Sequence, residues 1–149
     1  MPIGEICTRE VVVADKSLSV TEAAGLMRTH HVGDLVIVED RAGRRHPVGI
    51  VTDRDIAVEV VAAGVNPEAL TAGDIMTAEL ATLRESEGLY EALRYMRDRG
   101  VRRMPVVDAE GVLIGILALG DLLTLFAEEL TNVAKLLSRE RQHEADIRK

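Results

Sequence analysis

The chain has 149 residues, of which 47% are hydrophobic and 29% are charged, and its formal net charge is -7. That length and balance suit one well-buried domain, or two small domains that share a core. Aromatic residues make up only 2% and acids outnumber bases, so a surface that binds nucleic acid through base stacking or phosphate contacts is not expected.

The N-terminal segment has no basic stretch that leads into an apolar one, and the longest apolar run, 112–119, is too short to cross a bilayer. Cys7 is the single cysteine, which excludes an intramolecular disulfide and fits a reducing compartment. The four histidines show no spacing typical of a metal site. These features predict a cytoplasmic protein with no membrane contact and no bound metal.

The first half of the chain reads as strand, helix, strand, strand and helix. Residues 11–13 predict a short strand, and a capping box at 19–22 starts an amphipathic helix that should end near Thr29. Strands at 35–38 and 48–51, separated by a polar turn, then predict a hairpin.

The stretch Gly-Ile-Val-Thr-Asp-Arg-Asp at 49–55 marks the end of a buried strand and the start of a helix. A helix start leaves backbone N–H groups without partners and favours a phosphate, so Thr52 could donate beside one while Asp55 accepts from ribose hydroxyls. The same pattern is also a capping box, in which Thr52 and Asp55 bond only to each other's backbone. Both interpretations use the same atoms.

The second half of the chain repeats the first. An offset of 69 residues aligns 3–8 with 72–77 and 35–38 with 104–107, and an offset of 66 after the shorter hairpin turn aligns 49–55 with 115–121. Each unit is too small to have more than a thin core, so the two sheets are expected to pack together about a pseudo-twofold axis.

At this level of detail the chain resembles a tandem pair of CBS domains, called a Bateman module. The resemblance rests on Asp-Ile-Met-Thr at 74–77, Val-Arg-Arg-Met-Pro-Val-Val at 101–107 and the 49–55 stretch. It implies an α+β fold of two β-α-β-β-α repeats about a pseudo-twofold axis, with a C-terminal helical extension. The expected divisions are 3–63 for repeat 1, 64–71 for a connector, 72–127 for repeat 2 and 128–149 for the extension and polar tail.

The resemblance also implies a regulatory module without catalytic activity or a catalytic cofactor. It would bind an adenosine-containing ligand, such as AMP, ADP, ATP, NAD or S-adenosylmethionine, in a cleft between the repeats. The residues assigned to this cleft are Thr52, Arg54, Asp55, Leu80, Ala81, Val101, Arg102, Arg103, Met104 and Pro105.

These residue types also suit such a ligand on physical grounds. Leu80, Val101 and Met104 offer an apolar slot for a base, and the arginines can neutralise phosphate. The alternative is that Met104 and Pro105 are ordinary core residues and the arginines a solvated edge. The module would then be a scaffold for dimerisation or interaction that binds no ligand.

A second cleft departs from this pattern. Asp121 is present, but Ala118 stands where the first cleft has the Thr52 hydroxyl. The facing segment contains Val32 and Asp34, and a carboxylate near phosphate would be repulsive. The sequence therefore predicts one strong site and one weak site.

The last helix is longer than the repeat requires. Its apolar residues alternate spacings of three and four, which favours packing either on a partner helix or back on its own domain. These residues are Leu123, Phe126, Leu130, Val133 and Leu137. The polar segment 138–149 is expected to be a frayed helix end. A homodimer is predicted, together with a separate protein partner that the sequence does not identify.

Overall fold

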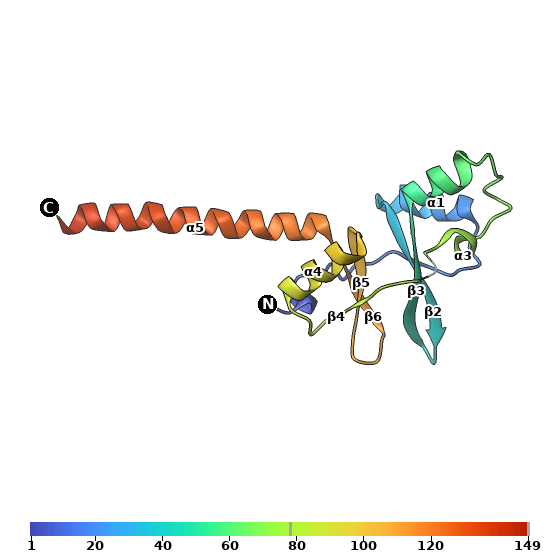
Figure 1. Cartoon of the computed structure of the whole chain (residues 1–149), viewed down its shortest axis with the longest axis horizontal. Coiled ribbons are helices and arrows are strands. Elements are labelled where there is room, and N and C mark those ends of the chain that lie inside the picture. Colours follow the sequence, from blue (N-terminus) through green and yellow to red (C-terminus); the bar gives the residue numbers. More distant parts are fainter. Residues whose placement is uncertain (78, 149) are drawn as a thin grey trace. The chain divides into compact units, whose positions relative to one another are not determined.

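The computed structural model describes residues 1–77 and 79–148 (Figure 1). The chain divides into two units, residues 1–117 and 118–149. The first unit holds two three-stranded sheets, with strand orders β1-β2-β3 and β4-β5-β6. Each sheet belongs to one of the two sequence repeats, which confirms the predicted α+β fold of two repeats.

The elements of the first repeat follow the predicted order. They are η1 (Ile3–Glu5), β1 (Val13–Ala14), α1 (Val20–His30), β2 (Asp34–Arg41), β3 (Arg44–Thr52), α2 (Asp53–Asp55) and η2 (Ile56–Val61). The second repeat has the same plan. Its elements are α3 (Ala72–Ile75), β4 (Leu83–Arg84), α4 (Leu89–Arg99), β5 (Arg103–Val107), β6 (Leu113–Ala118) and α5 (Leu119–Ile147).

Helix α1 begins at the predicted capping box. The Ser19 hydroxyl accepts from the Glu22 amide at 3.1 Å, and the Glu22 carboxylate accepts from the Ser19 amide at 2.9 Å. One face of the helix is apolar, and Ala23 and Met27 on this face are buried in the core of the first repeat. The cap and the apolar face together fix where the helix starts and which side it packs.

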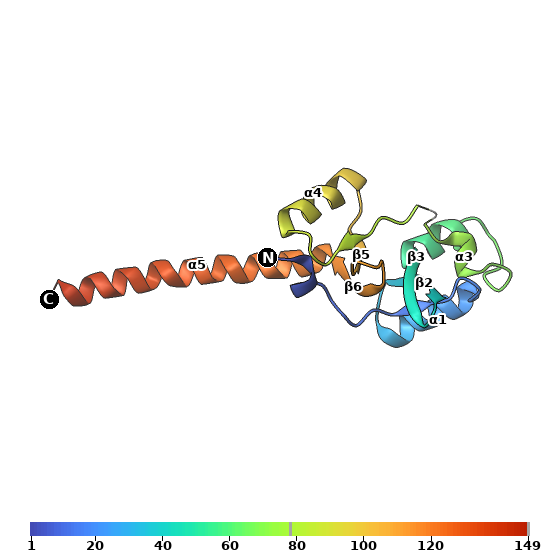
Figure 2. The same ribbon diagram turned by 90° about the horizontal axis from the view of Figure 1, so that it is seen from below.

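The hairpin of the first repeat is longer than the sequence indicated. Strands β2 and β3 pair antiparallel as far as Arg41 and Arg44, so only Ala42 and Gly43 remain in the turn (Figure 2). Both turn residues have positive φ, 56° and 80°. This two-residue turn geometry suits the right-handed twist of the strands, and it lets polar residues at the tip extend the ladder.

The helix predicted after Thr52 is present, but it changes type along its length. After one turn of α2 the backbone widens into the π-helix η2, in which the Ala62 amide donates to the Ala57 carbonyl at 2.9 Å. Val60 is buried. The chain thus leaves the Thr52 region through an unusual wide turn.

The N-terminal segment of each repeat packs on the other repeat. Ile3 and Gly4 donate their amides to the carbonyls of Glu87 and Glu85, both at 2.9 Å. The equivalent segment of repeat 2 does the same in reverse: the Ala72 amide donates to Leu18 at 2.7 Å and the Gly73 amide to Lys16 at 2.8 Å. These four bonds form two pairs related by the 69-residue offset. Each repeat therefore receives the N-terminal segment of the other, and the two sets of contacts are related by the pseudo-twofold axis.

Further along the same N-terminal segments, more backbone hydrogen bonds join the two repeats. Thr8 forms an antiparallel bridge with Ile116, and at the equivalent place the Thr77 amide donates to the Ile50 carbonyl at 3.1 Å. Glycines make this approach possible, because a Cβ at Gly115 would lie 2.8 Å from the Thr8 carbonyl oxygen. The two repeats thus hold each other through backbone contacts as well as through side chains.

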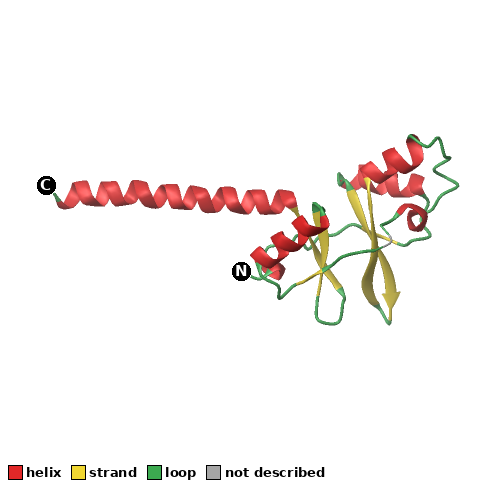
Figure 3. Cartoon of the chain, in the orientation of Figure 1, coloured by secondary structure: helices red, strands yellow, loops and turns green. Residues whose placement is uncertain are grey.

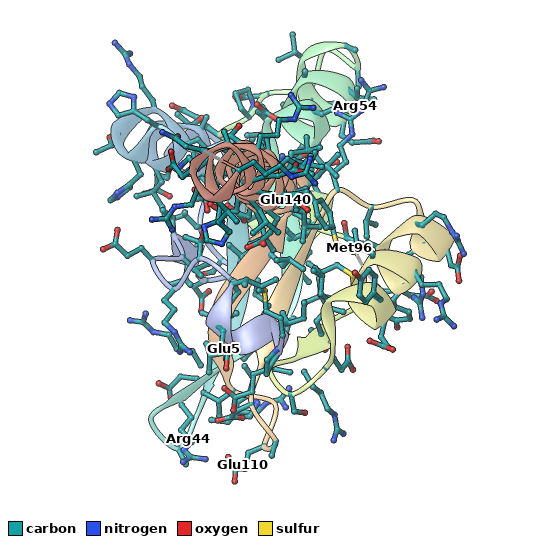
Figure 4. All side chains as sticks on the ribbon, turned by 90° about the vertical axis from the view of Figure 1, so that its left-hand side faces the viewer. Glu5, Arg44, Arg54, Met96, Glu110 and Glu140 are labelled. Atoms are coloured by element: carbon teal, nitrogen blue, oxygen red, sulfur yellow. The ribbon has the colours of Figure 1, made fainter. Side chains whose placement is uncertain are left out.

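The two sheets share an apolar cluster. Val36 and Ile50 of the first sheet are buried with Ile116 of the second, and Val11 and Leu80 pack against them from equivalent positions of the two repeats. Figure 2 shows the β2–β3 and β5–β6 hairpins side by side. At the hairpin tips Arg44 lies 3.7 Å from Glu110, and Figure 4 shows these two side chains together.

The second unit is the helix α5, which Figure 3 shows as one uninterrupted helix. It runs for 29 residues to Ile147, so the polar segment is helical up to that residue. An Arg148–Glu144 ion pair of 2.7 Å supports its last turn. Among the residues that the structure describes, no helix combines the length and hydrophobicity that crossing a membrane requires.

Candidate functional site

The candidate site is centred on the end of β3, where Thr52 caps the following helix. The Thr52 hydroxyl accepts from the Asp55 amide at 3.1 Å, and Asp55 Oδ2 accepts from the Thr52 amide at 2.8 Å. The predicted capping box is therefore present. Because a hydroxyl has one proton to donate besides its lone pairs, Thr52 can cap the helix and still donate to a ligand.

The backbone donors at this helix start are already used within the chain. The Asp53 amide donates to the Gly33 carbonyl at 3.0 Å, and the Arg54 amide donates to Asp53 Oδ1 at 2.8 Å. Together with the two bonds of the capping box, these contacts satisfy the amides of residues 52–55. A phosphate would have to displace some of them, so the helix start is less open to an anion than the sequence suggested.

Asp53 is a member of this site that the sequence interpretation missed. Its carboxylate also lies beside Gly33, where an added Cβ would come within 3.1 Å of Asp53 Oδ2. The bare glycine backbone thus lets the loop before β2 approach the helix start. No local sequence pattern signals this contact, because Gly33 and Asp53 come from segments that only the fold brings together.

An ion pair between the repeats reaches the same place. Arg103 donates to the Asp34 carboxylate, and Asp34 pairs with Thr52 across the β2–β3 ladder. Both charged side chains are half-buried, with 31% of Arg103 and 21% of Asp34 exposed. The structure therefore brings Arg103 of repeat 2 next to the Thr52 strand end, and Asp34, assigned to the weak site, is its partner.

The remaining residues predicted for the strong cleft fall into two groups. Met104 and Pro105 are buried in β5, and Leu80 packs into the apolar cluster between the sheets. Ala81 is half-buried, whereas the last three residues are exposed: Arg54, Val101 and Arg102. Met104, Pro105 and Leu80 are thus packed within the fold, whereas the side chains of Arg54, Val101 and Arg102 are exposed.

The predicted second site is divided between the two units. In the first unit, Val32 lines a cavity of about 450 Å³. The other lining residues are Glu10, Val11, Val12, Val13, Leu26 and His30. In the second unit, the Asp121 carboxylate accepts from the Ala118 amide at 2.9 Å at the start of α5.

The sequence interpretation missed most of this cavity, although the repeat itself carried the signal. The 69-residue offset places Val11 and Val12 at the positions of Leu80 and Ala81, which were assigned to the strong cleft. His30 is exposed at the end of α1 and also lines the cavity. Within the described part of the chain, no cluster of three or more His, Cys, Asp or Glu side chains suits a metal ion.

Comparison with known proteins agrees with this architecture. The family model for the CBS domain matches residues 3–62 and again residues 72–128. The chain is 39% identical over 121 residues to the protein MK0525 of Methanopyrus kandleri, a match that covers 81% of this chain and 60% of that protein. It is 33% identical over 120 residues to the CBS domain-containing protein YhcV of Bacillus subtilis, which covers 80% of this chain and 81% of the relative.

A solved structure gives the same result for the fold. The CBS domain pair of the protein MJ0100, solved in complex with 5-methylthioadenosine and S-adenosyl-L-methionine, superposes with a TM-score of 0.75. The two chains are 27% identical, and the match covers 87% of this chain and 98% of that one. Since the family model covers more than half of the sequence, in two copies that coincide with the two sheets, the chain belongs to the CBS-domain family as a tandem pair.

Proposed function

We propose that this chain is a regulatory module that binds an adenosine-containing ligand at the Thr52 end of β3 and carries out no catalysis. The observation that carries the proposal is that three functional groups lie close together there: a hydroxyl, a carboxylate and a guanidinium. The capped helix start offers the Thr52 hydroxyl and the Asp55 carboxylate, and repeat 2 adds Arg103 through its pair with Asp34. A hydroxyl donor, a carboxylate acceptor and a cation match a ribose and a neighbouring phosphate.

The MJ0100 complex supports this ligand class, because that CBS domain pair holds two adenosine derivatives. For this chain, Asp55 is proposed to accept from the ribose hydroxyls and Thr52 to donate toward the 5′ side of the sugar. Leu80 and Val101 are proposed to line the slot for the base, with Arg54 and Arg102 at its edge. A weaker second site is proposed from the sequence alone, because Ala118 stands where the first repeat has the Thr52 hydroxyl.

The occupied amides favour ligands with little or no phosphate in the present conformation. A phosphate must compete with Asp34 for Arg103 and with carbonyl and carboxylate groups for the backbone donors. 5-Methylthioadenosine has no phosphate, so it needs neither Arg103 nor the backbone amides as partners for one. We therefore expect it to bind without rearrangement, and we expect AMP, ADP, ATP and NAD to bind only by separating Arg103 from Asp34.

The test is a thermal-shift panel of these ligands together with S-adenosylmethionine. At about 100 times the dissociation constant a ligand adds about 2.7 kcal/mol of stability. For a chain of this length that raises Tm by roughly 5–10 °C. At least one ligand should produce this shift, and guanosine monophosphate serves as the control for base selection.

The alternative function is a scaffold that has kept the fold without a ligand. The specific observation in its favour is that Asp34 neutralises Arg103 and that Met104 and Pro105 are buried. A panel without any shift would support the scaffold and overturn the sensor. In either case the single cysteine fits action in the cytoplasm, and a separate protein is proposed as the partner to which a sensor would signal.

A further inference from the structure

The cavity of repeat 1 lies between the segment that leads into β1 and the end of α1. Val11 and Val12 line it from the strand side, and Val32 lines it from the segment after the helix. Leu26 and His30 line it from the last turns of α1. Because these two residues are four positions apart, they lie on the same face of the helix. Helix positions 26 and 30 therefore border the pocket of this repeat.

Repeat 2 has larger side chains at these two helix positions. The 69-residue offset that aligns the repeats places Tyr95 at the position of Leu26 and Arg99 at the position of His30. The same offset relates the strand and loop residues of the cavity to three residues that the sequence assigned to the ligand cleft, namely Leu80, Ala81 and Val101. Tyr95 and Arg99 therefore occupy the helix face that borders this cleft.

Tyr95 also lies beside the start of β4. It lines a cavity of about 260 Å³ together with Thr82, the residue between Ala81 and that strand. This contact agrees with the position inferred from the repeat, because Thr82 is equivalent to Val13, which lines the cavity of repeat 1. Tyr95 thus borders the strand side of the cleft in repeat 2.

The ring of Tyr95 is held by Arg99. The central carbon of the Arg99 guanidinium lies 5.0 Å from the centroid of the ring, and Arg99 Nη2 donates to the Tyr95 hydroxyl at 3.0 Å. A cation over the ring and a hydrogen bond to its hydroxyl together restrict the rotation of the side chain. Tyr95 still exposes 37% of its surface, so part of the ring remains open to a ligand.

A short segment connects this ring to the other end of the proposed site. Helix α4 ends at Arg99, and Arg103, four residues further on, donates to Asp34 beside Thr52. An extended chain spans at most about 3.6 Å per residue, so the Cα atoms of Arg99 and Arg103 lie within about 14 Å of each other. This separation allows one ligand to contact both the ring and the Arg103 end of the site.

We propose that the base of the ligand stacks on the ring of Tyr95. The inference rests on the proposed function, because it assigns a contact for the base in the same site. The chain has two tyrosines, one phenylalanine and no tryptophan, and Tyr95 is the aromatic residue at the helix position that borders the cleft. Stacking of a base on an aromatic side chain strengthens binding by about five- to 150-fold and tolerates any base.

Titration calorimetry with 5-methylthioadenosine and with AMP tests the contact. Tyr95→Leu introduces the residue that repeat 1 has at this position and removes the ring. It should weaken both ligands about fivefold or more, and by the same factor, because both ligands carry the same base. Tyr95→Phe keeps the ring and should stay within about threefold of the wild type. Tyr90→Leu is the matched control, since Tyr90 lies on the same helix, is 74% exposed and should not affect affinity.

Tyrosine fluorescence gives a direct readout, because the chain contains no tryptophan. In Tyr90→Phe, Tyr95 is the single tyrosine, and a purine stacked on its ring should quench its emission as the site fills. In Tyr95→Phe, Tyr90 is the single tyrosine, and its emission should stay constant. A purely structural role for Tyr95 would change stability without producing this quenching.

Two results would overturn the inference and leave the proposed function intact. One is affinity that is unchanged or higher in Tyr95→Leu, and the other is saturation of Tyr90→Phe with ligand without quenching. The fluorescence experiment keeps the native Tyr95, so it decides the question even if Tyr95→Leu does not fold. If neither 5-methylthioadenosine nor AMP nor any other ligand of the panel binds the wild type, the proposed function and this inference are both wrong.

Discussion

Asp34 and Arg103, which occupy equivalent positions in the two repeats, form an ion pair across the interface between those repeats. A second pair between the repeats, Arg44–Glu110, joins their hairpin tips. Tandem repeats that diverge can acquire opposite charges at one structural position, and a pseudo-twofold axis then brings these charges together. The Asp34–Arg103 pair lies beside Thr52, at the place that the proposal assigns to the ligand.

The first prediction concerns this pair. Asp34→Asn removes the charge that holds Arg103 and leaves the side-chain size nearly unchanged. If a phosphate competes with Asp34, the affinity for AMP should rise about tenfold, which corresponds to about 1.4 kcal/mol. Affinity for 5-methylthioadenosine should stay within about twofold.

Isothermal titration of both ligands measures these changes. Glu110→Gln is the matched control, because it removes the acid of the other pair between the repeats at the hairpin tips. An equal gain for both ligands, or no gain for AMP, would show that Asp34 does not compete with phosphate.

The second prediction separates capping from ligand binding at Thr52. Thr52→Ala removes the hydroxyl that accepts from the Asp55 amide, so it should lower the free energy of unfolding by about 0.5–2 kcal/mol. If the hydroxyl also donates to the ligand, the dissociation constant should weaken about tenfold or more.

Thr52→Ser provides the control, because it keeps the hydroxyl and should restore both stability and affinity. Urea unfolding and titration with the best ligand measure the two effects separately. If Thr52→Ala loses stability but keeps the same affinity, Thr52 caps the helix and does not bind the ligand.

The third prediction tests the exchanged N-terminal segments. A Cβ at Gly115 would lie 2.8 Å from the Thr8 carbonyl oxygen and 2.6 Å from Cys7 Sγ, so Gly115→Ala must push the segment away from β6. We expect a loss of about 1–3 kcal/mol in urea unfolding.

Gly25→Ala is the matched control. Gly25 lies in helix α1 with no atom within 4 Å of an added Cβ, so this substitution should stabilise the protein by about 0.5–1 kcal/mol. A Gly115→Ala protein as stable as the wild type would mean that the segment does not pack closely on β6.

The sequence predicted the repeat, the order of its elements and the capping boxes, because periodicity and capping patterns are local properties of neighbouring residues. It also predicted that Thr52 and Asp55 would act together. It did not predict that Asp34 would pair with Arg103, because Arg103 was assigned to the strong cleft and Asp34 to the weak one. Only the packing of the two repeats determines which side chains meet across their interface.

The same distinction explains the other differences. The amides at the start of α2 looked available in the sequence, but Gly33 approaches from a separate loop and binds one of them. The cavity lined by Val11 and Val32 also requires the placement of β1 against α1. Contacts of this kind depend on tertiary structure, and no local pattern specifies them.

The fourth prediction is a pH dependence at the start of α3. Hydrogen bonds from Thr71, chiefly from its backbone amide at 2.8 Å, lower the pKa of Asp74 from its ordinary value of 3.8. A carboxyl whose pKa is lower in the folded state stabilises the fold above its unfolded pKa, and this contribution is lost as pH falls through the folded pKa.

Asp74→Ala should therefore be less stable than the wild type at pH 7 and at pH 5, and the difference should shrink as pH falls below about 4. Urea unfolding of both proteins across this range gives the comparison. A difference that stays constant with pH would mean that the Asp74 charge contributes nothing to stability.

The most direct test of the ligand site is calorimetric titration of the ligand that gives the largest thermal shift, with Asp55→Ala and Asp121→Ala compared against the wild type. The two aspartates occupy equivalent positions in the repeats, and each caps a helix, so the variants are matched in their structural cost. We predict one strong site per chain in the wild type and a tenfold or greater loss of its affinity in Asp55→Ala. Asp121→Ala should keep the strong site, and loss of binding in Asp121→Ala but not in Asp55→Ala would contradict the assignment.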